Sequence, residues 1–375
     1  MKICDINVFP VRLPMKQSFS TSGGLVGNAD AGAPHVYVRM RTDCGAEGWG
    51  EARPSHRWSY ETLETVTGTI EIYLKPLLLG KEANDLHGIH ALMNREIKAG
   101  LGSGQPIAKA AVDMALHDLI GRAAGASLAK LWLSSASQSA QLSYLISTAN
   151  PDEAAAKAAN AFKLGYKGID VKLGIDPASD IDILEAVKGE APGLFIRADA
   201  NQAYTLPRAV QVAKQMERIG IDIFEQPLRA NQLLGHAELR RKTSIPIALD
   251  ESIWTAGDVL EAIRQEACDA IVIKLTKMGG LLSAKLCGEI AREAGLELLG
   301  GGLTESGLGL SASAHMFNYL QIASPYDLNG PLFLQDDPVD AGPAVDEGHV
   351  YLPDRPGIGC SLSMDKIMKY STQSA

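Results

Sequence analysis

Residues 168–275 contain five short apolar runs of one kind: GIDVKL (168–173), LFIRAD (194–199), IDIFEQ (221–226), PIALDE (246–251) and AIVIKL (270–275). The runs carry five charged residues near their carboxyl ends, at intervals of 27, 26, 25 and 24 residues: Lys172, Asp199, Glu225, Asp250 and Lys274. Each interval has the length of one strand, one helix and their loops. Asp327 lies 53 residues beyond Lys274, which is about two further units. We therefore expect a ring of strand–helix units whose polar strand ends meet at one mouth.

The same alternation extends to both sides of this segment. Further apolar runs stand at 142–147 (LSYLIS) and 296–301 (LELLGG), and helical patterns separate the runs at 207–219, 255–266 and 281–294. Strands that are buried on both faces are continuously apolar, as in a parallel sheet inside a ring of helices. Seven strands are clear, and an eighth is expected near 321–327. We predict a (β/α) barrel over residues 131–345.

The first 130 residues have a different pattern. Residues 2–13 alternate apolar and polar side chains, and residues 35–41 and 46–52 do the same around the turn TDCG, which predicts a hairpin. Helical patterns follow at 59–78, 86–99 and 105–123. This order of elements indicates an α+β domain over residues 1–130. We expect the tail, residues 346–375, to form a short strand, a turn and a terminal helix that pack back on that domain.

Composition limits the possible functions. The 375-residue chain has a formal net charge of −9, which argues against nucleic acid or an anionic membrane surface as a partner. No window holds 18 consecutive apolar residues, and the N-terminus lacks the apolar stretch of a signal peptide, so no membrane span is expected. Five scattered cysteines, an odd number without a CxxC pair, indicate reduced thiols. We expect a cytoplasmic protein.

The carboxylates Asp199, Glu225 and Asp250 carry the strongest functional signal. On three successive strand ends they would lie close together, and three such charges stay ionised only beside a cation. A hard divalent ion with oxygen ligands, most simply Mg²⁺, meets this requirement. The alternative is that one or more of them caps a helix or pairs with an arginine, for which Arg197 and Arg208 are near in sequence.

Lys172 and Lys274 stand one strand before and one strand after the carboxylates, which on a closed barrel sets them on opposite sides of the metal. A divalent cation lowers the pKa of a neighbouring lysine, so each can act as a base near neutral pH. The metal can stabilise the enediolate formed when the proton α to a substrate carboxylate leaves. Two such bases suit removal of a proton from one face and its return to the other. Three other lysines are expected to be surface residues: Lys163, Lys167 and Lys277.

Several motifs resemble the enolase superfamily and, within it, the muconate lactonizing enzyme subgroup. They cover nearly the whole chain: GWGEA (48–52), AAVDMALHDLIGRAAG (110–125), ADANQAY (198–204), FEQPL (224–228), IALDES (247–252), IKLTKMGGL (273–281), LTESGLG (303–309) and PGIG (356–359). The resemblance implies an α/β fold, a modified TIM barrel (β/α)7β with an N-terminal α+β capping domain that is completed by the C-terminal tail and supplies substrate specificity. Lys172 would match the second lysine of the subgroup's KxK motif, Lys274 its sixth-strand lysine, and the three carboxylates its metal ligands.

One position departs from the subgroup's pattern. The KxK motif is Asp170-Val171-Lys172 here, and the side-chain period of a strand places Asp170 on the same face as Lys172. A carboxylate there would raise the pKa of Lys172 instead of lowering it. Either the metal outweighs Asp170, or Asp170 binds a cationic group of the substrate. Our hypothesis is substrate recognition, in which Asp170→Asn raises KM more than it lowers kcat.

Asp327 and Asn329 resemble a second recognition motif. At this position muconate cycloisomerases of the subgroup carry a glutamate, whereas dipeptide epimerases carry an Asp-x-Asp that holds the substrate's ammonium group. Asp327-x-Asn329 is nearer to the second pattern, and together with Asp170 it favours a substrate with an amine or other cationic group. A capping role for Asp327 is the alternative.

The capping domain and the barrel loops supply further candidate substrate-binding residues. Residues 13–27 and 53–58 match the two loops that close over the substrate in this superfamily. Within the second loop, Arg57 is suited to bind a distal carboxylate and Trp58 to stack on an apolar or cationic group. A solvated loop is the alternative. Asn201 is a candidate beside the first metal ligand, and Glu305 either hydrogen-bonds Lys274 or lies behind it.

The sequence therefore predicts a Mg²⁺-dependent isomerase that acts on a small carboxylate substrate. Racemisation or epimerisation of an amino-acid-like substrate is the favoured reaction, while muconate-type cycloisomerisation and dehydration of a small hydroxy acid (a lyase reaction) stay open. A Schiff-base lyase would leave the carboxylates unexplained, and an inactive binding protein would show damage at the metal or lysine positions. By resemblance, the chain is expected to form a homo-oligomer.

Overall fold

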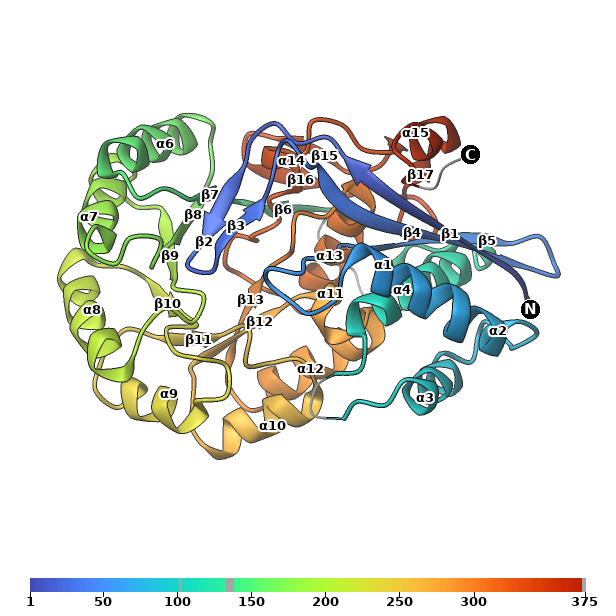
Figure 1. Cartoon of the computed structure of the whole chain (residues 1–375), viewed down its shortest axis with the longest axis horizontal. Coiled ribbons are helices and arrows are strands. Elements are labelled where there is room, and N and C mark those ends of the chain that lie inside the picture. The colour runs from blue at the N-terminus through green and yellow to red at the C-terminus, as the bar shows by residue number, and fades with distance from the viewer. Residues whose placement is uncertain (101–102, 133–137, 373–375) are drawn as a thin grey trace.

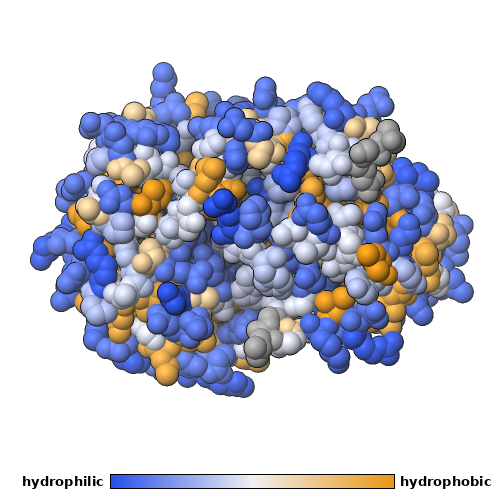
Figure 2. Space-filling view, viewed as in Figure 1, coloured by the Kyte–Doolittle hydropathy of each residue, from blue (hydrophilic) through white to orange (hydrophobic). Residues whose placement is uncertain are grey.

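The structure is a computed structural model that describes residues 1–375 except 101–102, 133–137 and 373–375. It combines a ring of parallel strands, surrounded by helices, with a three-stranded antiparallel sheet that carries its own helices (Figure 1). The predicted modified barrel with an N-terminal α+β domain is confirmed. On the face seen in Figure 2, apolar side chains are scattered among polar ones. Among the described residues, no helix has the length and apolar character needed to cross a membrane.

Seven parallel strands form the wall of the barrel, in the order β13-β12-β11-β10-β9-β8-β7. Their bounds are β7 Ser143–Ile146, β8 Gly168–Lys172, β9 Phe195–Asp199, β10 Ile223–Glu225, β11 Ile247–Leu249, β12 Ala270–Ile273 and β13 Glu297–Gly300. Each lies within one of the predicted apolar runs.

Two residues fill the eighth position of the wall. Tyr326 forms a parallel bridge with Leu142, and Asp327 forms one with Gly301, so the pair joins the two outer strands of the sheet. The predicted eighth strand is shorter than expected because Pro325, directly before Tyr326, has no N–H to donate to a ladder. The ring is thereby closed with Asp327 at its mouth.

Helices follow the strands of the ring, in agreement with the predicted alternation, and α14 comes after the closing residues Tyr326 and Asp327. They are α6 Pro151–Lys163, α7 Asp180–Glu190, α8 Leu206–Ile219, α9 Leu233–Arg240, α10 Ala256–Arg264, α11 Leu275–Met278, α12 Leu281–Glu293, α13 Gly307–Tyr319 and α14 Gly330–Phe333. Local sequence sets their ends: Thr255 and Asp258 cap α10 reciprocally, and Gly220, with a left-handed φ of 80°, ends α8. Because all the strands run the same way, their carboxyl ends lie at one mouth.

The small domain is built on the antiparallel sheet β1 (Ile3–Leu13), β4 (Ala33–Thr42) and β5 (Glu47–Ala52). Helix α4 (Pro106–Ala123) lies against β5 at close range. A side chain at Gly48 or Gly50 would collide with the backbone of α4, which explains both glycines of the GWGEA motif.

The remaining elements of this domain refine the prediction. They are α1 Leu63–Gly68, a π-helical turn at Thr69–Leu74, α2 Lys75–Leu78 and α3 Leu86–Glu96. The helix predicted from residue 59 begins at Leu63, because Thr62 and Thr65 form a capping box there. Residues 13–27, predicted as a loop, contain a hairpin of β2 (Phe19–Thr21) with β3 (Gly24–Gly27).

Two aspartates of α4 attach the small domain to the rest of the chain. Asp113 Oδ2 accepts a hydrogen bond from Leu281 N at the start of α12 (2.5 Å). Asp118 accepts a hydrogen bond from Ile358 N in the C-terminal segment (2.8 Å) and, within the small domain, one from Trp49 N (2.9 Å). The two aspartates of the AAVDMALHDLIGRAAG motif therefore hold the small domain against α12 and the C-terminal segment.

The C-terminal residues contact β1. Arg12 N donates to Tyr370 O and Thr372 N donates to Pro10 O, both at 3.0 Å. The short elements of this region and of the connection to the barrel are α5 Leu128–Leu131, β6 Ser139–Gln141, β14 Val339–Ala341, β15 Ala344–Asp346, β16 His349–Tyr351, β17 Ser361–Leu362 and α15 Met364–Lys369.

Candidate active site

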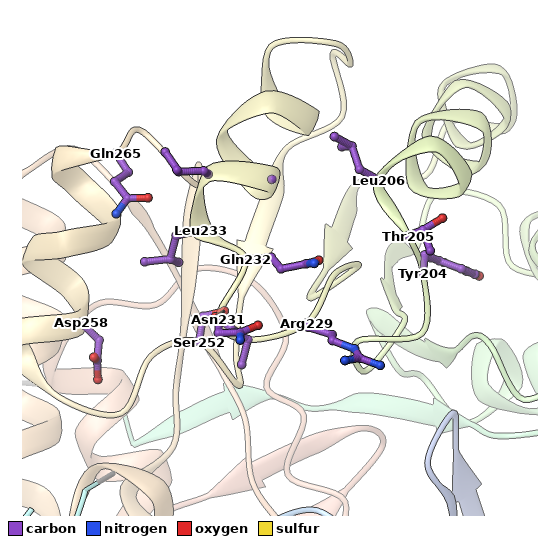
Figure 3. Close-up of a pocket in the computed structure, with 13 residues that line it drawn as sticks. Tyr204, Thr205, Leu206, Arg229, Asn231, Gln232, Leu233, Ser252, Asp258 and Gln265 are labelled. Atoms are coloured by element: carbon purple, nitrogen blue, oxygen red, sulfur yellow. Dashed lines mark hydrogen bonds between the residues drawn. The ribbon is translucent and has the colours of Figure 1, made fainter. Parts of the chain in front are cut away.

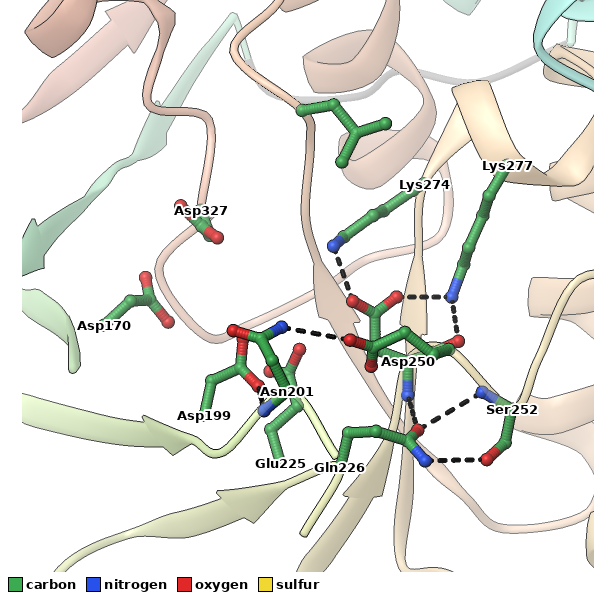
Figure 4. Close-up of polar contacts among 12 residues, drawn as sticks. Asp170, Asp199, Asn201, Glu225, Gln226, Asp250, Ser252, Lys274, Lys277 and Asp327 are labelled. Atoms are coloured by element: carbon green, nitrogen blue, oxygen red, sulfur yellow. Dashed lines mark hydrogen bonds and ion pairs between the residues drawn. The ribbon is translucent and has the colours of Figure 1, made fainter. Parts of the chain in front are cut away.

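The strand ends bring the five charged residues of the opening pattern to one mouth. Figure 4 shows four of them, Asp199, Glu225, Asp250 and Lys274. Lys172, Asp199 and Glu225 are the last residues of β8, β9 and β10, while Asp250 and Lys274 directly follow β11 and β12. The three carboxylates are fully buried, and the two lysines are at most 7 % exposed. Ionised side chains at this burial need partners of opposite charge, and the mouth supplies them in pairs.

Lys172 pairs with the first carboxylate. Its Nζ lies 2.6 Å from Asp199 Oδ2. Burial alone would lower the pKa of Lys172, but the negative charges of Asp199, Asp327 and Glu225 outweigh burial and raise that pKa above its usual value. In this arrangement Lys172 is therefore an ammonium group.

Asp250 pairs with two lysines. Lys274 Nζ lies 2.6 Å from Asp250 Oδ2, and Lys277 Nζ donates to Asp250 Oδ1 (2.7 Å) and to the Asp250 carbonyl (2.6 Å). The prediction that Lys277 is a surface residue is wrong, since its side chain is fully buried. It stands on α11, the short helix that follows β12, and this turn of helix directs its side chain back to Asp250.

Glu225 shares an arginine with Asp170. Arg197 Nε contacts Glu225 Oε2 and lies 3.1 Å from Asp170 Oδ1, while Arg197 Nη1 donates to Gly300 O (3.1 Å). Glu225 therefore pairs with an arginine, as the alternative interpretation of the three carboxylates proposed. Burial raises the pKa of Asp170 to about 7, against the opposing effect of Arg197 and with that of Asp327.

Sequence reasoning missed Arg197 as the partner of Asp170, although a signal existed. The two residues are paired across the parallel strands β8 and β9 in the register Asp170↔Arg197, two positions before the pair Lys172↔Asp199. Asp170, which replaces the first lysine of the KxK motif, therefore has a basic partner, Arg197, on the adjacent strand.

Asn201 lies beside an acidic residue that was also missed. Asn201 Nδ2 donates to Glu251 Oε1 (3.0 Å), and Glu251 Oε2 is buried without a hydrogen-bond partner. Burial and the nearby Asp250 and Asp199 raise the pKa of Glu251 to about 8. Its position, next to Asp250 in the LDES motif, was the available signal.

The remaining barrel candidates lie on the late strand ends. Figure 4 shows Asp327 and Asp170 on the same side of the three carboxylates, and Asn329 Nδ2 lies 3.3 Å from Asp327 Oδ1. Glu305 accepts hydrogen bonds from Thr276 Oγ1 (3.0 Å) and from Leu303 N (2.7 Å). The predicted role of Glu305 beside Lys274 stays a prediction.

The loop of residues 53–58 covers the Lys274 side of the mouth. Lys274 Nζ lies 4.7 Å from the centre of the Trp58 ring, a cation–π contact. Trp58 packs on Trp254, with ring centres 5.6 Å apart, and Trp254 in turn packs on Tyr60 at 6.4 Å. Trp254 follows the fifth strand and was not among the predicted residues.

The hairpin β2–β3 covers the Lys172 side. Ser20 exchanges hydrogen bonds with Ser147 just beyond β7, with its N donating to Ser147 Oγ (3.0 Å) and its carbonyl accepting from that hydroxyl (2.7 Å). Ser22 Oγ donates to Asn201 O just beyond β9 (2.7 Å). Since β7 and β9 flank β8, the hairpin spans the strand that carries Lys172.

A large cavity lies elsewhere. It measures about 770 Å³ and is bordered by the start of α8, the start of α9 and residues of α10, among them Tyr204, Arg229 and Asp258 (Figure 3). None of the predicted site residues lines it. The chemistry argued above therefore belongs to the polar mouth and not to this cavity.

The triad has the donor chemistry of a magnesium site. Asp199, Glu225 and Asp250 offer only oxygen atoms, and Glu225 Oε1 is buried with no hydrogen-bond partner, as expected of an atom that is short of a cation. Within the described ranges, no three Asp, Glu, His or Cys side chains are already arranged as a metal-ligand group, since each carboxylate turns to a basic side chain. The residues fit a divalent cation, provided that Glu225 gives up part of its contact with Arg197.

Comparison with known proteins assigns the family. Residues 4–132 match the mandelate racemase / muconate lactonizing enzyme N-terminal domain, and residues 153–366 match the enolase C-terminal domain-like family. The chain belongs to this enolase-like family of mandelate racemase and muconate lactonizing enzymes. The predicted superfamily and subgroup are confirmed, and so is the prediction of an isomerase.

Its relatives include epimerases, racemases and cycloisomerases. The chain is 32 % identical over 363 residues to the L-Ala-D/L-Glu epimerase of Bacillus subtilis, covering 96 % of both chains. It is 30 % identical over 353 residues to muconate cycloisomerase 1 of Rhodococcus opacus, covering 90 % of this chain and 91 % of that one.

Solved structures agree over the whole length. The N-succinyl Arg/Lys racemase of Bacillus cereus superposes with a TM-score of 0.93 at 28 % identity, covering 100 % of this chain and 99 % of that one. The dipeptide epimerase of Cytophaga hutchinsonii, complexed with Mg and the dipeptide D-Ala-L-Val, superposes with a TM-score of 0.91 at 28 % identity and 98 % coverage of both chains.

Proposed function

We propose that this chain is a Mg²⁺-dependent racemase or epimerase that moves the proton α to the carboxylate of a small amino-acid-like substrate. The observation that carries the proposal is the placement of Lys172 at the end of β8 and of Lys274 directly after β12. The two lysines thus lie on either side of β9, β10 and β11, whose carboxyl ends present the three carboxylates. Proton transfer between two faces requires one lysine on each side of the substrate, one as a neutral amine that takes the proton and the other as an ammonium group that gives one.

A divalent cation held by Asp199, Glu225 and Asp250 would supply positive charge where negative charge develops on the substrate carboxylate. The magnesium complex of the dipeptide epimerase described above supports this choice of ion. The chain's own part is to present all three carboxylates from rigid strand ends and to keep Asp250 in place through Lys277.

In the proposed reaction one lysine removes a proton from the substrate and the other lysine donates one. In the forward direction the neutral amine of one lysine takes the α-proton and becomes an ammonium group, while the ammonium group of the other lysine gives a proton to the opposite face. The reverse reaction uses the same groups in the opposite roles, so no proton is gained or lost over one turnover. Trp58 lies over Lys274 and would keep bulk water from that side of the carbanion-like intermediate.

The acidic residues beyond the triad favour an amine-bearing substrate. Asp327 and Asn329 are buried at the mouth, and Asp327 is positioned to accept from a substrate ammonium group. Two of the similar proteins are named dipeptide epimerases, which supports the same class. Cycloisomerisation, named for another relative, begins with related proton chemistry, but a dianionic substrate would meet Asp170 and Asp327 at this mouth.

The test is exchange of the α-proton in D₂O, followed by NMR with Mg²⁺ present. The panel holds dipeptides, N-acylated amino acids and muconates. We expect deuterium to enter at the α-carbon of an amino-acid derivative together with inversion of that centre. Formation of a lactone from muconate without exchange in any amino-acid derivative would overturn the proposal in favour of a cycloisomerase. Assembly as a homo-oligomer and a cytoplasmic location stay predictions, the first of which light scattering of the purified protein checks.

A further inference from the structure

Gln226 directly follows Glu225 at the end of β10, and its side chain is fully buried among the loops that present the three carboxylates (Figure 4). Its φ is +37°, in the left-handed region that a residue other than glycine keeps only when its surroundings enforce it. Glycine adopts such a backbone without strain, so the contacts of the glutamine side chain have to offset the cost of this conformation.

All four hydrogen-bonding positions of the Gln226 amide are occupied. Its Oε1 accepts from Asp250 N (2.8 Å) and from Ser252 N (3.2 Å). Its Nε2 donates to Leu228 O (3.0 Å) and to Ser252 Oγ (2.8 Å), a hydroxyl that gives its own proton to Ala230 O (2.9 Å). An amide has two donors and two acceptor lone pairs, so this surrounding uses its capacity completely and fixes which end of the amide is the oxygen.

The main chain of Gln226 joins the same loops. Its N donates to Ala248 O of β11 (2.9 Å), and its carbonyl accepts from Gln202 N (2.8 Å) in the loop that follows β9. One residue therefore contacts the loop after β9, the strand β11 and, through its side chain, the loop after β11. Together with its own strand β10, these segments present all three of the proposed metal ligands.

The spacing of the carboxylates decides which cation they suit. Mg²⁺ requires near-octahedral oxygen ligands at about 2.1 Å, whereas Ca²⁺ accepts more varied contacts of about 2.3–2.6 Å. Lys274 and Lys277 hold Asp250 from the segment after β12, whereas Gln226 ties Asp250 N to the strand that ends in Glu225. The separation of Asp250 from Glu225 thus depends on the amide of Gln226.

We propose that Gln226 is a positioning residue that sets the separation of the metal-binding carboxylates and thereby makes the site selective for Mg²⁺ over Ca²⁺. The inference rests on the proposed function, in which Asp199, Glu225 and Asp250 bind the cation. Gln226 touches neither the cation nor the substrate in this role, and it moves no proton. It acts through the main chain of Asp250 and through its own peptide link to Glu225.

Calorimetric titration of Mg²⁺ and of Ca²⁺ into the metal-free full-length protein tests the proposal without turnover. Gln226→Met keeps the length of the side chain but removes its four hydrogen bonds. We expect Mg²⁺ affinity to fall about tenfold or more and Ca²⁺ affinity to fall less than about threefold, so that the preference for Mg²⁺ shrinks.

Gln202→Met is the matched control. It removes an amide from the neighbouring loop, where Gln202 Oε1 accepts from Ala230 N (2.9 Å), and it leaves the contacts of the Gln226 side chain in place. We expect this variant to keep the ratio of the Mg²⁺ and Ca²⁺ affinities of the parent protein.

Ser252→Ala covers the case in which Gln226→Met does not fold. The change removes one acceptor of Gln226 Nε2 but keeps the bond from Asp250 N, so we expect a loss of about threefold in the preference for Mg²⁺. An unchanged ratio of the two affinities in the folded variants, even at a lower free energy of unfolding, would overturn the positioning role and leave the proposed function intact. Absence of Mg²⁺ binding by the parent protein would overturn the proposed function and this inference with it.

Discussion

Arg197 Nε lies 3.1 Å from Asp170 Oδ1, and the same guanidinium contacts Glu225, so one buried cation is shared between a residue outside the proposed metal triad and a residue inside it. Both side chains of the Arg197–Asp170 pair are at most 2 % exposed. Whatever draws Arg197 toward Asp170 leaves Glu225 freer to bind a cation.

Asp170→Asn is therefore expected to weaken Mg²⁺ binding about tenfold, because Arg197 would then pair with Glu225 alone. Calorimetric titration of Mg²⁺ into the purified variant measures this directly, with the exposed Asp182→Asn as the control. If Mg²⁺ affinity stays unchanged while KM for the substrate rises, Asp170 acts on the substrate, as the sequence hypothesis has it. A defect in kcat alone contradicts both accounts.

Lys172→Ala and Lys274→Ala should each abolish inversion, with a loss of about a thousandfold, since each removes the proton donor or acceptor of one face. Exchange from a single enantiomer is expected to survive in each variant, with opposite preference in the two. Starting from each enantiomer in D₂O distinguishes the faces. The exposed Lys163→Ala is the matched control, and equal loss of both exchange reactions in either variant would argue against two separate bases.

Lys277→Met tests the buried lysine that transfers no proton to or from the substrate in the proposed reaction. The change removes the donor to both Asp250 Oδ1 and the Asp250 carbonyl, so we expect a loss of about 3 kcal/mol in the free energy of unfolding. Urea denaturation of the Mg²⁺-free protein measures it. A variant as stable as the parent would mean that Lys274 alone satisfies Asp250.

Trp58→Ala is expected to lower kcat/KM about tenfold, because the Lys274 ammonium loses a ring at 4.7 Å and the mouth opens to water. Trp58→Phe keeps an aromatic face and should lose less. The contact between Trp58 and Trp254 gives an independent reading, since its loss should change the intrinsic fluorescence of Trp254. If the fluorescence changes while kcat/KM stays the same, Trp58 packs on Trp254 but has no role in the reaction.

His236 makes stability depend on pH. Its Nδ1 lies 2.9 Å from Gln232 O and its Nε2 accepts from Leu228 N, the pattern of a neutral ring, and burial lowers its pKa to about 4. Above the unfolded pKa of about 6.5 this contribution to stability is fully present, and it is lost as the pH falls toward 4. From pH 7 to pH 5 the loss amounts to about 2 kcal/mol. His236→Asn should lose correspondingly less over that interval in urea denaturation, and an equal loss would contradict the assignment.

The barrel and the five residues at its mouth were predictable because one short-range rule governs them. A strand buried on both faces is apolar throughout, so a charge at its end is conspicuous, and its recurrence every 24 to 27 residues fixes the ring. The pairing of Asp170 with Arg197 was within reach too, since adjacent parallel strands set their register once Lys172 and Asp199 are aligned.

The other contacts were beyond a reading of the sequence for physical reasons. The direction of Lys277 depends on the phase of a four-residue helix, which no periodicity in so short a segment reveals. The positions of Trp58 over Lys274 and of Ser22 on Asn201 depend on how one domain is seated on the other, and that is decided by contacts such as Asp113 with Leu281, 168 residues apart.

The two-residue closure of the ring at Tyr326 and Asp327 has a consequence for synthesis of the chain. Until these residues leave the ribosome, the outer edges of β7 and β13 have no partner, and an unpaired edge invites pairing with another chain. In the small domain, β1 obtains its last backbone partner even later, because Val11 forms a bridge with Ser371. We therefore expect nascent or prematurely terminated chains to depend on chaperones until residue 371 has been made, and a stop codon even shortly before residue 326 to yield aggregates.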